Sequence, residues 1–267
     1  MTVTLPLQAE TILKGLGQSI FARNLLYHES IGSTNVLAYE LGAQGAPEGT
    51  LVLAEYQSAG KGRMGRGWLA ERYLNLLFSI LLRPRLPPNQ IFSLTMILAL
   101  ATMEEIRKRC GLQPMIKWPN DIYVGRKKLG GILTEFSVKG KVIEYAVLGL
   151  GLNVNWNPGE GDGLLYPATS ILAETGHRLS RAELLIDILK SLERYYGKVL
   201  QGEFETFYKR WNEHSLIIGR AVQIESGTEK IRGKALRIEP DGSLVIEDRE
   251  GKERRILSGD VFWLTDG

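Results

Sequence analysis

The sequence predicts an α+β fold with a mixed β-sheet, followed by a small β-barrel. Short apolar runs typical of strands outnumber helical patterns, and glycine-containing turns join several of them as hairpins. Only short strands and turns follow Gly219. Hairpin-connected strands with helices inserted between them favour α+β over a doubly wound parallel sheet. We therefore expect a larger domain over residues 1–216 and a small barrel domain over residues 217–267.

Composition narrows the class of protein. The chain has 267 residues, of which 44% are apolar and 24% charged, as in soluble globular proteins. A net charge of +3 is too small for a surface that binds polyanions everywhere, so any anion site must be local. Cys110 is the single cysteine, which excludes an intrachain disulfide, and with three histidines it cannot supply a Cys/His zinc cluster without carboxylates.

No membrane segment or signal peptide is expected. The longest apolar run, residues 91–103, is shorter than the about 20 residues that a transmembrane helix needs. Residues 1–10 lack the basic start and the cleavage pattern of a signal peptide. These observations predict a cytoplasmic protein.

Helical signals occur in five places. Basic residues before Gly111 mark the end of one helix, and Ser180 with Glu183 forms the capping pattern that begins another. The expected helices are residues 11–22, a helix from Ser33 or Thr34 to before Gly42 or Gly45, a helix from Asn89 or Gln90 to Cys110, residues 184–200 and residues 203–212.

Strand signals are more numerous. Short apolar runs mark strands at 50–57 and 75–82, and residues 121–124 and 127–137 flank Gly125-Arg126 as in a hairpin. A second turn is expected within residues 138–142. Residues 142–155 form a long strand-like stretch broken by glycines, which permit a bulge or a flat ligand on the backbone.

The densest motif is the glycine-rich loop, residues 60–68, which reads Gly-Lys-Gly-Arg-Met-Gly-Arg-Gly-Trp. It matches G-x-G-x-x-G formally, but no acidic residue occurs from Arg72 to Met103, where a dinucleotide-binding fold needs one. Three cations alternate with four glycines. Glycine lets backbone N–H groups approach an anion and arginine forks onto phosphate or carboxylate, so this loop is suited to closing over an anion.

A second motif combines Lys-Trp-Pro-Asn-Asp at 117–121 with Lys128. A two-residue turn at Gly125-Arg126 would pair Val124 with Lys127, Tyr123 with Lys128 and Asp121 with Gly130. Paired residues share a face of the sheet, so this register predicts that Asp121, Tyr123 and Lys128 lie together. The alternative is a surface ion pair on a hairpin.

These motifs together resemble the biotin–protein ligase family. The resemblance covers residues 27–175 and rests on segments that occur in the family's order: Gly32–Asn35, Glu55–Gln57 with the glycine-rich loop, 117–121, 128–135, 149–153 and Ala168-Thr169-Ser170. It implies a core like that of class II aminoacyl-tRNA synthetases and an SH3-like C-terminal barrel. It also implies that biotin and ATP give biotinyl-5′-AMP, whose acyl group passes to a lysine of a biotin carrier domain.

The resemblance also implies roles for individual residues. Lys128, Arg63 and Asp121 would be catalytic, with Asp121 either assisting Mg²⁺ or deprotonating the incoming lysine. The residues implied to bind biotin are Ser33, Thr34, Asn35, Gln57, Lys61, Gly62, Arg63 and Lys128. The residues implied to bind ATP are Arg66, Lys117, Asn120 and Asn153. Mg²⁺ would be held mainly by phosphates.

Two departures and two alternatives accompany the resemblance. Many members have Arg where this chain has Lys61, and bifunctional members place a DNA-binding domain before the core. Only about 25 residues precede Tyr27 here, which predicts a ligase without repressor function and no DNA partner. A homodimer is expected because many members are homodimers. A lipoate or octanoyl transferase and a nucleic-acid-binding module are the competing interpretations.

Overall fold

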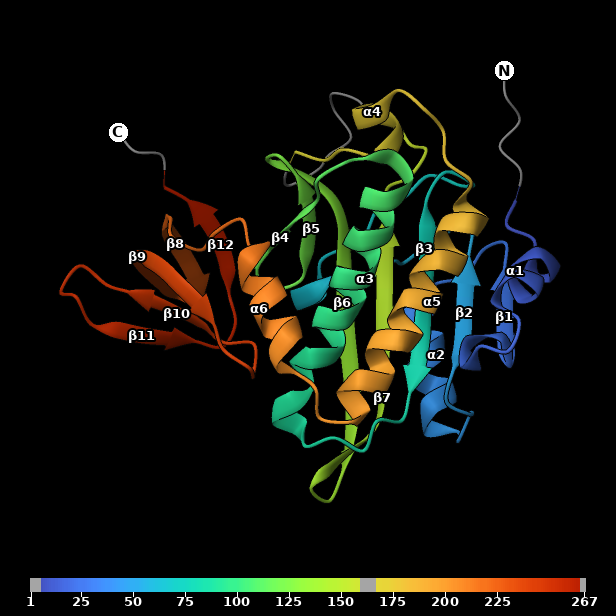
Figure 1. Cartoon of the computed structure of the whole chain (residues 1–267), viewed down its shortest axis with the longest axis horizontal. Coiled ribbons are helices and arrows are strands. Elements are labelled where there is room, and N and C mark those ends of the chain that lie inside the picture. Colours follow the sequence, from blue (N-terminus) through green and yellow to red (C-terminus); the bar gives the residue numbers. More distant parts are fainter. Residues whose placement is uncertain (1–5, 159–166, 265–267) are drawn as a thin grey trace.

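A seven-stranded mixed sheet forms the centre of the computed structural model, which describes residues 6–158 and 167–264 (Figure 1). The strand order is β1-β2-β3-β7-β6-β5-β4. β1 pairs with β2 in parallel, and every other neighbouring pair is antiparallel. The strands are β1 Asn24–His28, β2 Thr50–Ala54, β3 Leu76–Leu82, β4 Met115–Lys117, β5 Asp121–Val124, β6 Lys127–Lys139 and β7 Val142–Leu152. This sheet confirms the predicted α+β class.

Helices cover both faces of this sheet. α3 and α5 lie together on one face, and α2 lies against β2, β3 and β7 (Figure 1). Every residue of β2 and β3 is buried, which explains their continuous apolar sequences. The helices are α1 Ala9–Leu16, α2 Thr34–Ala43, α3 Phe92–Cys110, α4 Ile171–Thr175, α5 Arg181–Leu200 and α6 Glu205–Glu213. Within the described residues, no helix is long and apolar enough to cross a bilayer.

The helix ends follow the sequence signals, with one exception. α3 ends at Gly111 with φ 71°, and the Ser180 hydroxyl accepts a hydrogen bond from the Glu183 N–H at 3.3 Å. The helix expected over residues 11–22 was wrong in extent. α1 begins at Ala9 and ends at Leu16, because Gly17 takes φ 60° and a short 3₁₀ turn follows at Ile20–Ala22.

The predicted hairpin between β5 and β6 forms, but its register was wrong by one residue. Val124 pairs with Lys127 and Tyr123 with Lys128, as expected. A bulge between Ile122 and Tyr123 then pairs Asp121 with Gly131 instead of Gly130. β7 was also expected to be interrupted by its glycines, yet its pairing with β3 is continuous from Ala146 to Leu152.

Residues 221–263 form a separate five-stranded antiparallel sheet, here termed the C-terminal sheet, with the order β11-β10-β9-β8-β12. Its strands are β8 Ala221–Ser226, β9 Glu229–Ile238, β10 Leu244–Glu247, β11 Glu253–Ile256 and β12 Asp260–Trp263. Trp263 packs edge-on against Tyr123 of β5, with 5.9 Å between the ring centroids. The Trp118 indole N–H donates to the Gly242 carbonyl at 2.8 Å, so both contacts join this sheet to the main one.

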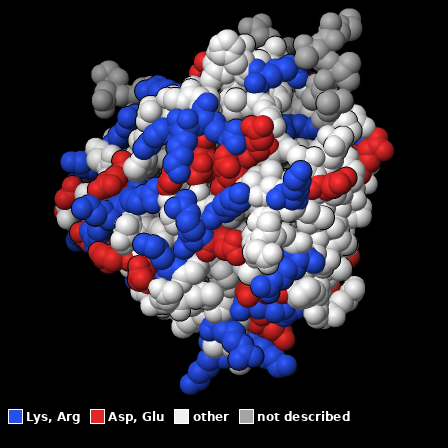
Figure 2. Space-filling view, turned by 45° about the vertical axis from the view of Figure 1, so that its right-hand side comes forward, with Lys and Arg blue, Asp and Glu red and all other residues white. Residues whose placement is uncertain are grey.

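Charge is dispersed over the surface. Figure 2 shows Lys and Arg interspersed with Asp and Glu over the face that it presents. This mixture agrees with the small net charge of +3, so an anion site is expected inside a pocket and not across the surface.

Candidate active site

A pocket of about 360 Å³ opens between the glycine-rich loop, the start of α2, the β5–β6 hairpin, β7 and the C-terminal sheet. All thirteen residues put forward from the sequence line it. They are Ser33, Thr34, Asn35, Gln57, Lys61, Gly62, Arg63, Arg66, Lys117, Asn120, Asp121, Lys128 and Asn153. The structure thus brings the separated motifs into one site, while the role of each residue stays a prediction.

The glycine-rich loop forms a small hairpin over this pocket. The Gly62 N–H donates to the Arg66 carbonyl at 2.7 Å, and the Trp68 N–H donates to the Gly60 carbonyl at 2.9 Å. A Cβ added to Gly60 would lie 2.7 Å from the Trp68 oxygen, so glycine is required for this close approach. Met64 turns the tip with φ 56°. The hairpin directs Arg63 and Arg66 to the pocket side.

Several cations are held in the pocket, and two of them are poorly solvated. Burial lowers the pKa of Lys117, which is 6% exposed, and outweighs the opposing effect of the Asp121 carboxylate. Burial likewise lowers the pKa of Arg63, whose guanidinium contacts the Asn120 amide oxygen at 3.5 Å. Partly desolvated positive groups gain most from an anionic ligand, which the pocket is therefore suited to bind.

Lys128 occupies the centre of the site. Its ammonium lies 2.8 Å from Asp121, so the predicted ion pair forms in spite of the shifted register. Its backbone N–H donates to the Pro167 carbonyl, and its carbonyl accepts from the Thr169 N–H, each at 2.8 Å. The segment with Ala168 therefore runs beside β6 and fixes the main chain from which the Lys128 side chain projects.

Three buried polar atoms in the pocket have no hydrogen-bond partner among the described residues. They are the Ser33 hydroxyl, the Asn153 amide oxygen and the Trp68 indole nitrogen. Ser33 stands at the N-cap of α2, as predicted, but its side chain makes no capping hydrogen bond. Buried polar atoms are rarely left unpaired in folded proteins, so these three atoms have hydrogen-bonding capacity left for an ordered water or a ligand.

The site also contains residues that the sequence did not indicate. The Arg66 guanidinium forms two hydrogen bonds with Asp260 of β12, at 2.8 and 3.0 Å. Lys117 lies 4.6 Å above the ring of Trp263. Asp260 is 194 residues from Arg66 in the chain, and no local pattern in its sequence marks it as a partner.

The mixed sheet bears a cationic glycine-rich loop that faces a central lysine, and a second sheet forms part of the pocket wall. This arrangement is that of an enzyme that binds its ligand in the pocket between the loop and the two sheets. Residues 27–153 match the model of the Biotin/lipoate A/B protein ligase family, and residues 217–264 match the Biotin protein ligase C terminal domain. The chain belongs to this family of protein ligases.

Relatives match over most of the chain. It is 36% identical to the bifunctional ligase/repressor BirA of Bacillus subtilis, over 92% of this chain and 76% of that protein. It is 32% identical to the biotin–[acetyl-CoA-carboxylase] ligase of Mycobacterium tuberculosis, over 87% and 86% of the two chains. The solved structure of the Aquifex aeolicus biotin protein ligase with biotin and ATP superposes with a TM-score of 0.76, at 29% identity, covering 90% of this chain and 98% of that one.

Proposed function

We propose that the chain joins biotin to AMP and then transfers the biotinyl group to a lysine of a biotin carrier domain, such as that of acetyl-CoA carboxylase. The observation that carries this proposal is the Lys128–Asp121 pair facing the arginines of the glycine-rich loop across one pocket. The names of the relatives, which include biotin–[acetyl-CoA-carboxylase] ligases, support the choice of substrates.

In the first step, the biotin carboxylate attacks the α-phosphorus of ATP and pyrophosphate leaves. Two anions must approach each other, and cations have to offset their repulsion and the charge that develops. Lys128 would lie between the carboxylate and the α-phosphate. Arg63 and Lys61 would close over the acyl phosphate, and Arg66 would contact the ATP phosphates.

The two ends of the intermediate would occupy different parts of the pocket. Ser33, Thr34 and Gln57 would bind the cyclic urea of biotin, which offers both donors and acceptors. Asn120, Asn153 and Lys117 would face the nucleotide. Closure of the loop would keep water from the mixed anhydride, which hydrolyses readily.

In the second step, a lysine amine of the carrier domain attacks the acyl carbon and AMP leaves. Asp121 would take the proton that the amine loses, or would assist Mg²⁺. Among the residues that the structure describes, two carboxylates line the pocket, and each is already in an ion pair, Asp121 with Lys128 and Asp260 with Arg66. Mg²⁺ would therefore draw most of its ligands from ATP, and the phosphates would hold the ion.

Further features follow the family resemblance. We infer a core of the class II aminoacyl-tRNA synthetase type, which the mixed sheet supports, and an SH3-like barrel over residues 217–267, which the antiparallel C-terminal sheet supports. We also infer a homodimer and a cytoplasmic location, where ATP and the carrier domain are both available.

A mass-spectrometric assay tests the proposal. The protein is supplied with ATP, Mg²⁺ and either biotin or lipoate, and we expect pyrophosphate and biotinyl-AMP with biotin. The family model also includes lipoate ligases, so lipoyl-AMP in place of biotinyl-AMP would favour that function. Salt-dependent DNA binding without ATP turnover would instead favour a nucleic-acid-binding module.

A further inference from the structure

Glu135 of β6 does not line the pocket but accepts a hydrogen bond from Asn35, which does. The Asn35 amide N–H₂ donates to Glu135 Oε2 at 2.8 Å and to the Leu133 carbonyl at 3.3 Å. Both partners can only accept hydrogen bonds. They therefore fix the orientation of the amide, with its nitrogen towards β6 and its oxygen towards Ser79 of β3.

A short chain of oxygen atoms leads from this amide into the pocket. The Ser79 hydroxyl lies 2.7 Å from the Asn35 amide oxygen and 2.8 Å from the Thr34 hydroxyl. The Thr34 hydroxyl lies 3.0 Å from the Gln57 amide oxygen, which also accepts the Thr34 backbone N–H at 2.7 Å. The chain thus contains three oxygen–oxygen contacts but only the two hydroxyl protons of Ser79 and Thr34.

Counting these protons determines the direction of each hydrogen bond. The oxygen of Asn35 can only accept, so it takes the Ser79 proton. Thr34 then donates its one proton either to Ser79 or to Gln57. In both cases the Thr34 oxygen receives no proton from the chain. Its lone pairs remain available to a ligand at the pocket wall, next to the unpartnered Ser33 hydroxyl.

The negative charge of Glu135 maintains this direction. If the Asn35 amide turned over, its oxygen would face the carboxylate at the 2.8 Å separation, and the two would repel. The amide nitrogen would then donate to Ser79, and the Ser79 proton would turn to Thr34. The Thr34 oxygen would then already accept the Ser79 proton, so it would accept a hydrogen bond from a ligand less strongly.

We propose that Glu135 is a positioning residue that sets the hydrogen-bond direction of this chain, so that the pocket selects a head group with N–H donors. The cyclic urea of biotin is such a group. The inference rests on the proposed function, but it concerns how the head group is recognised and not whether an adenylate forms. Glu135 acts through Asn35, Ser79 and Thr34 and touches no ligand itself.

Glu135→Gln is the sharpest test, because the side chain keeps its shape but gains a donor that can pair with a turned-over Asn35. The substrates are biotin and the two cyclic carbamate analogues in which one urea N–H is replaced by oxygen, which turns a donor into an acceptor. The wild type should prefer biotin over at least one analogue by about 10²-fold or more in kcat/KM. Glu135→Gln should narrow that ratio about tenfold and raise KM for biotin, with KM for ATP unchanged.

Glu144→Gln is the matched control, since Glu144 lies on the neighbouring strand β7 outside the pocket and should leave the ratio unchanged. Glu135→Asp withdraws the carboxylate by one methylene and should narrow the ratio about threefold, which keeps the test open if Glu135→Gln fails to fold. A variant that loses activity equally towards biotin and the analogues would overturn the proposal, because a structural role predicts that result. A wild type that activates no biotin would instead refute the proposed function.

Discussion

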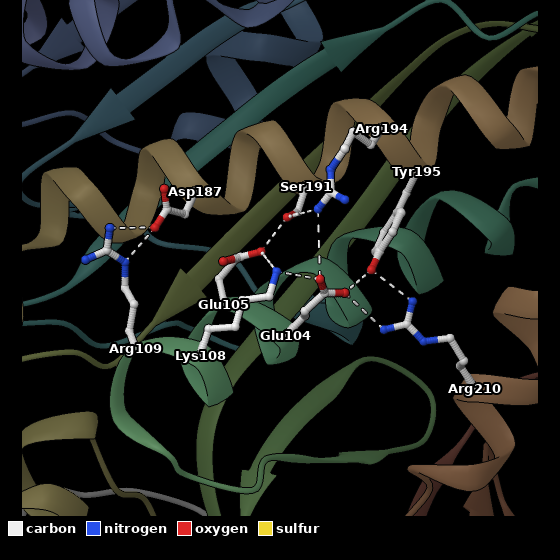
Figure 3. A network of polar contacts seen from close by, with 9 residues as sticks. All are labelled: Glu104, Glu105, Lys108, Arg109, Asp187, Ser191, Arg194, Tyr195 and Arg210. Carbon is white, nitrogen blue, oxygen red and sulfur yellow. Dashed lines mark hydrogen bonds and ion pairs between the residues drawn. The ribbon is translucent and has the colours of Figure 1, made fainter.

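Charged side chains gather in two regions of the molecule, the helical face formed by α3, α5 and α6 and the pocket. The two regions differ in how fully their charged and polar groups have partners. On the helical face each charged group drawn in Figure 3 has a partner. Glu104 contacts Lys108 at 2.6 Å, Arg210 at 3.2 Å and the Tyr195 hydroxyl. In the pocket, three buried polar atoms lack partners among the described residues, and Lys117 and Arg63 are partly desolvated.

The difference separates stability from function. A network whose members satisfy one another stabilises the packing of helices and has no capacity left for a ligand. A pocket with unpaired donors and acceptors contributes less to folding but binds a ligand that completes it. Substitutions on the helical face should therefore change stability with little effect on activity, and substitutions in the pocket should do the reverse.

Loss of the central cation should have the largest effect. We expect Lys128→Met to lower kcat/KM for biotin at least about 10²-fold, because Lys128 would lie between the carboxylate and the α-phosphate and offset the charge of both. Pyrophosphate release measures this. Lys127→Met is the control, since Lys127 is exposed and lies 3.8 Å from Glu174. Equal losses in the two variants would contradict the central position of Lys128.

The loop should retain the intermediate. We expect Arg63→Gly still to form biotinyl-AMP but to release it, because the loop would lose the guanidinium that closes over the acyl phosphate. Labelling of an added bystander protein should rise about tenfold. The exposed Arg126→Gly in the hairpin turn serves as the control. Tight retention of biotinyl-AMP by Arg63→Gly would refute this prediction.

The floor of the pocket should not tolerate a methyl group. A Cβ on Gly149 would lie 2.0 Å from the Asn35 amide oxygen, so Gly149→Ala must displace Asn35. We expect KM for biotin to rise about tenfold, which corresponds to about 1.4 kcal/mol. In Gly197→Ala no atom lies within 4 Å of the new Cβ, and this helical control should gain about 0.5–1 kcal/mol of stability. An unchanged KM in Gly149→Ala would show that Asn35 can move freely.

On the helical face the effect should appear in stability. Partial burial would raise the pKa of Glu104, but hydrogen bonds from Lys108, Tyr195 and Arg210 outweigh it and lower the pKa to about 2. A carboxyl with a depressed pKa in the folded state stabilises the protein above its ordinary value near 4.5, and this contribution is lost as the pH falls towards 2. We expect Glu104→Gln to cost about 1 kcal/mol at pH 7 and kcat to stay the same.

Thermal unfolding between pH 2 and pH 7 measures the contribution of Glu104. The gap in melting temperature between the wild type and Glu104→Gln should close as the pH falls below 4.5, because protonation removes the same charge. A gap that is constant with pH would mean that packing, and not charge, accounts for the difference.

The smallest effect should come from Asp260, which pairs with Arg66 across the two sheets. We expect Asp260→Asn to lower KM for ATP about threefold at low salt. In this variant Arg66 would no longer have to leave an ion pair with a carboxylate before it contacts a phosphate of ATP. The difference in KM for ATP between the wild type and Asp260→Asn should shrink as the salt concentration is raised. Glu247→Gln on β10 is the control. A rise in KM for ATP would indicate that Asp260 orients Arg66 for the phosphates.

Sequence reasoning found the side chains of the site but not all of its contacts. The glycine-rich loop and the Asp–Lys pair on one hairpin depend on residues close together in the chain, so they can be recognised in the sequence. The bulge between Ile122 and Tyr123 is not visible in the pattern, so the register was shifted by one residue. The ion pair still formed, because side chains as long as Lys span such a shift.

The contributions of the C-terminal sheet and of Glu135 could not have been predicted in this way. Asp260 meets Arg66 only because two sheets pack together, and packing between distant segments has no periodic signature. Glu135 belongs to a recognised motif, but its role is proposed from the directions of the hydrogen bonds that join it to Asn35, Ser79 and Thr34, and these four residues come from three separate segments.

β12 is an edge strand that pairs with β8 alone among the described residues, yet it carries Asp260 to the pocket and Trp263 to Lys117, which we propose faces the nucleotide. Fraying of this one strand would remove the Trp263 ring from beneath Lys117 while leaving Thr34 and Gln57 in place. As denaturant is added, affinity for ATP should therefore fade before affinity for biotin.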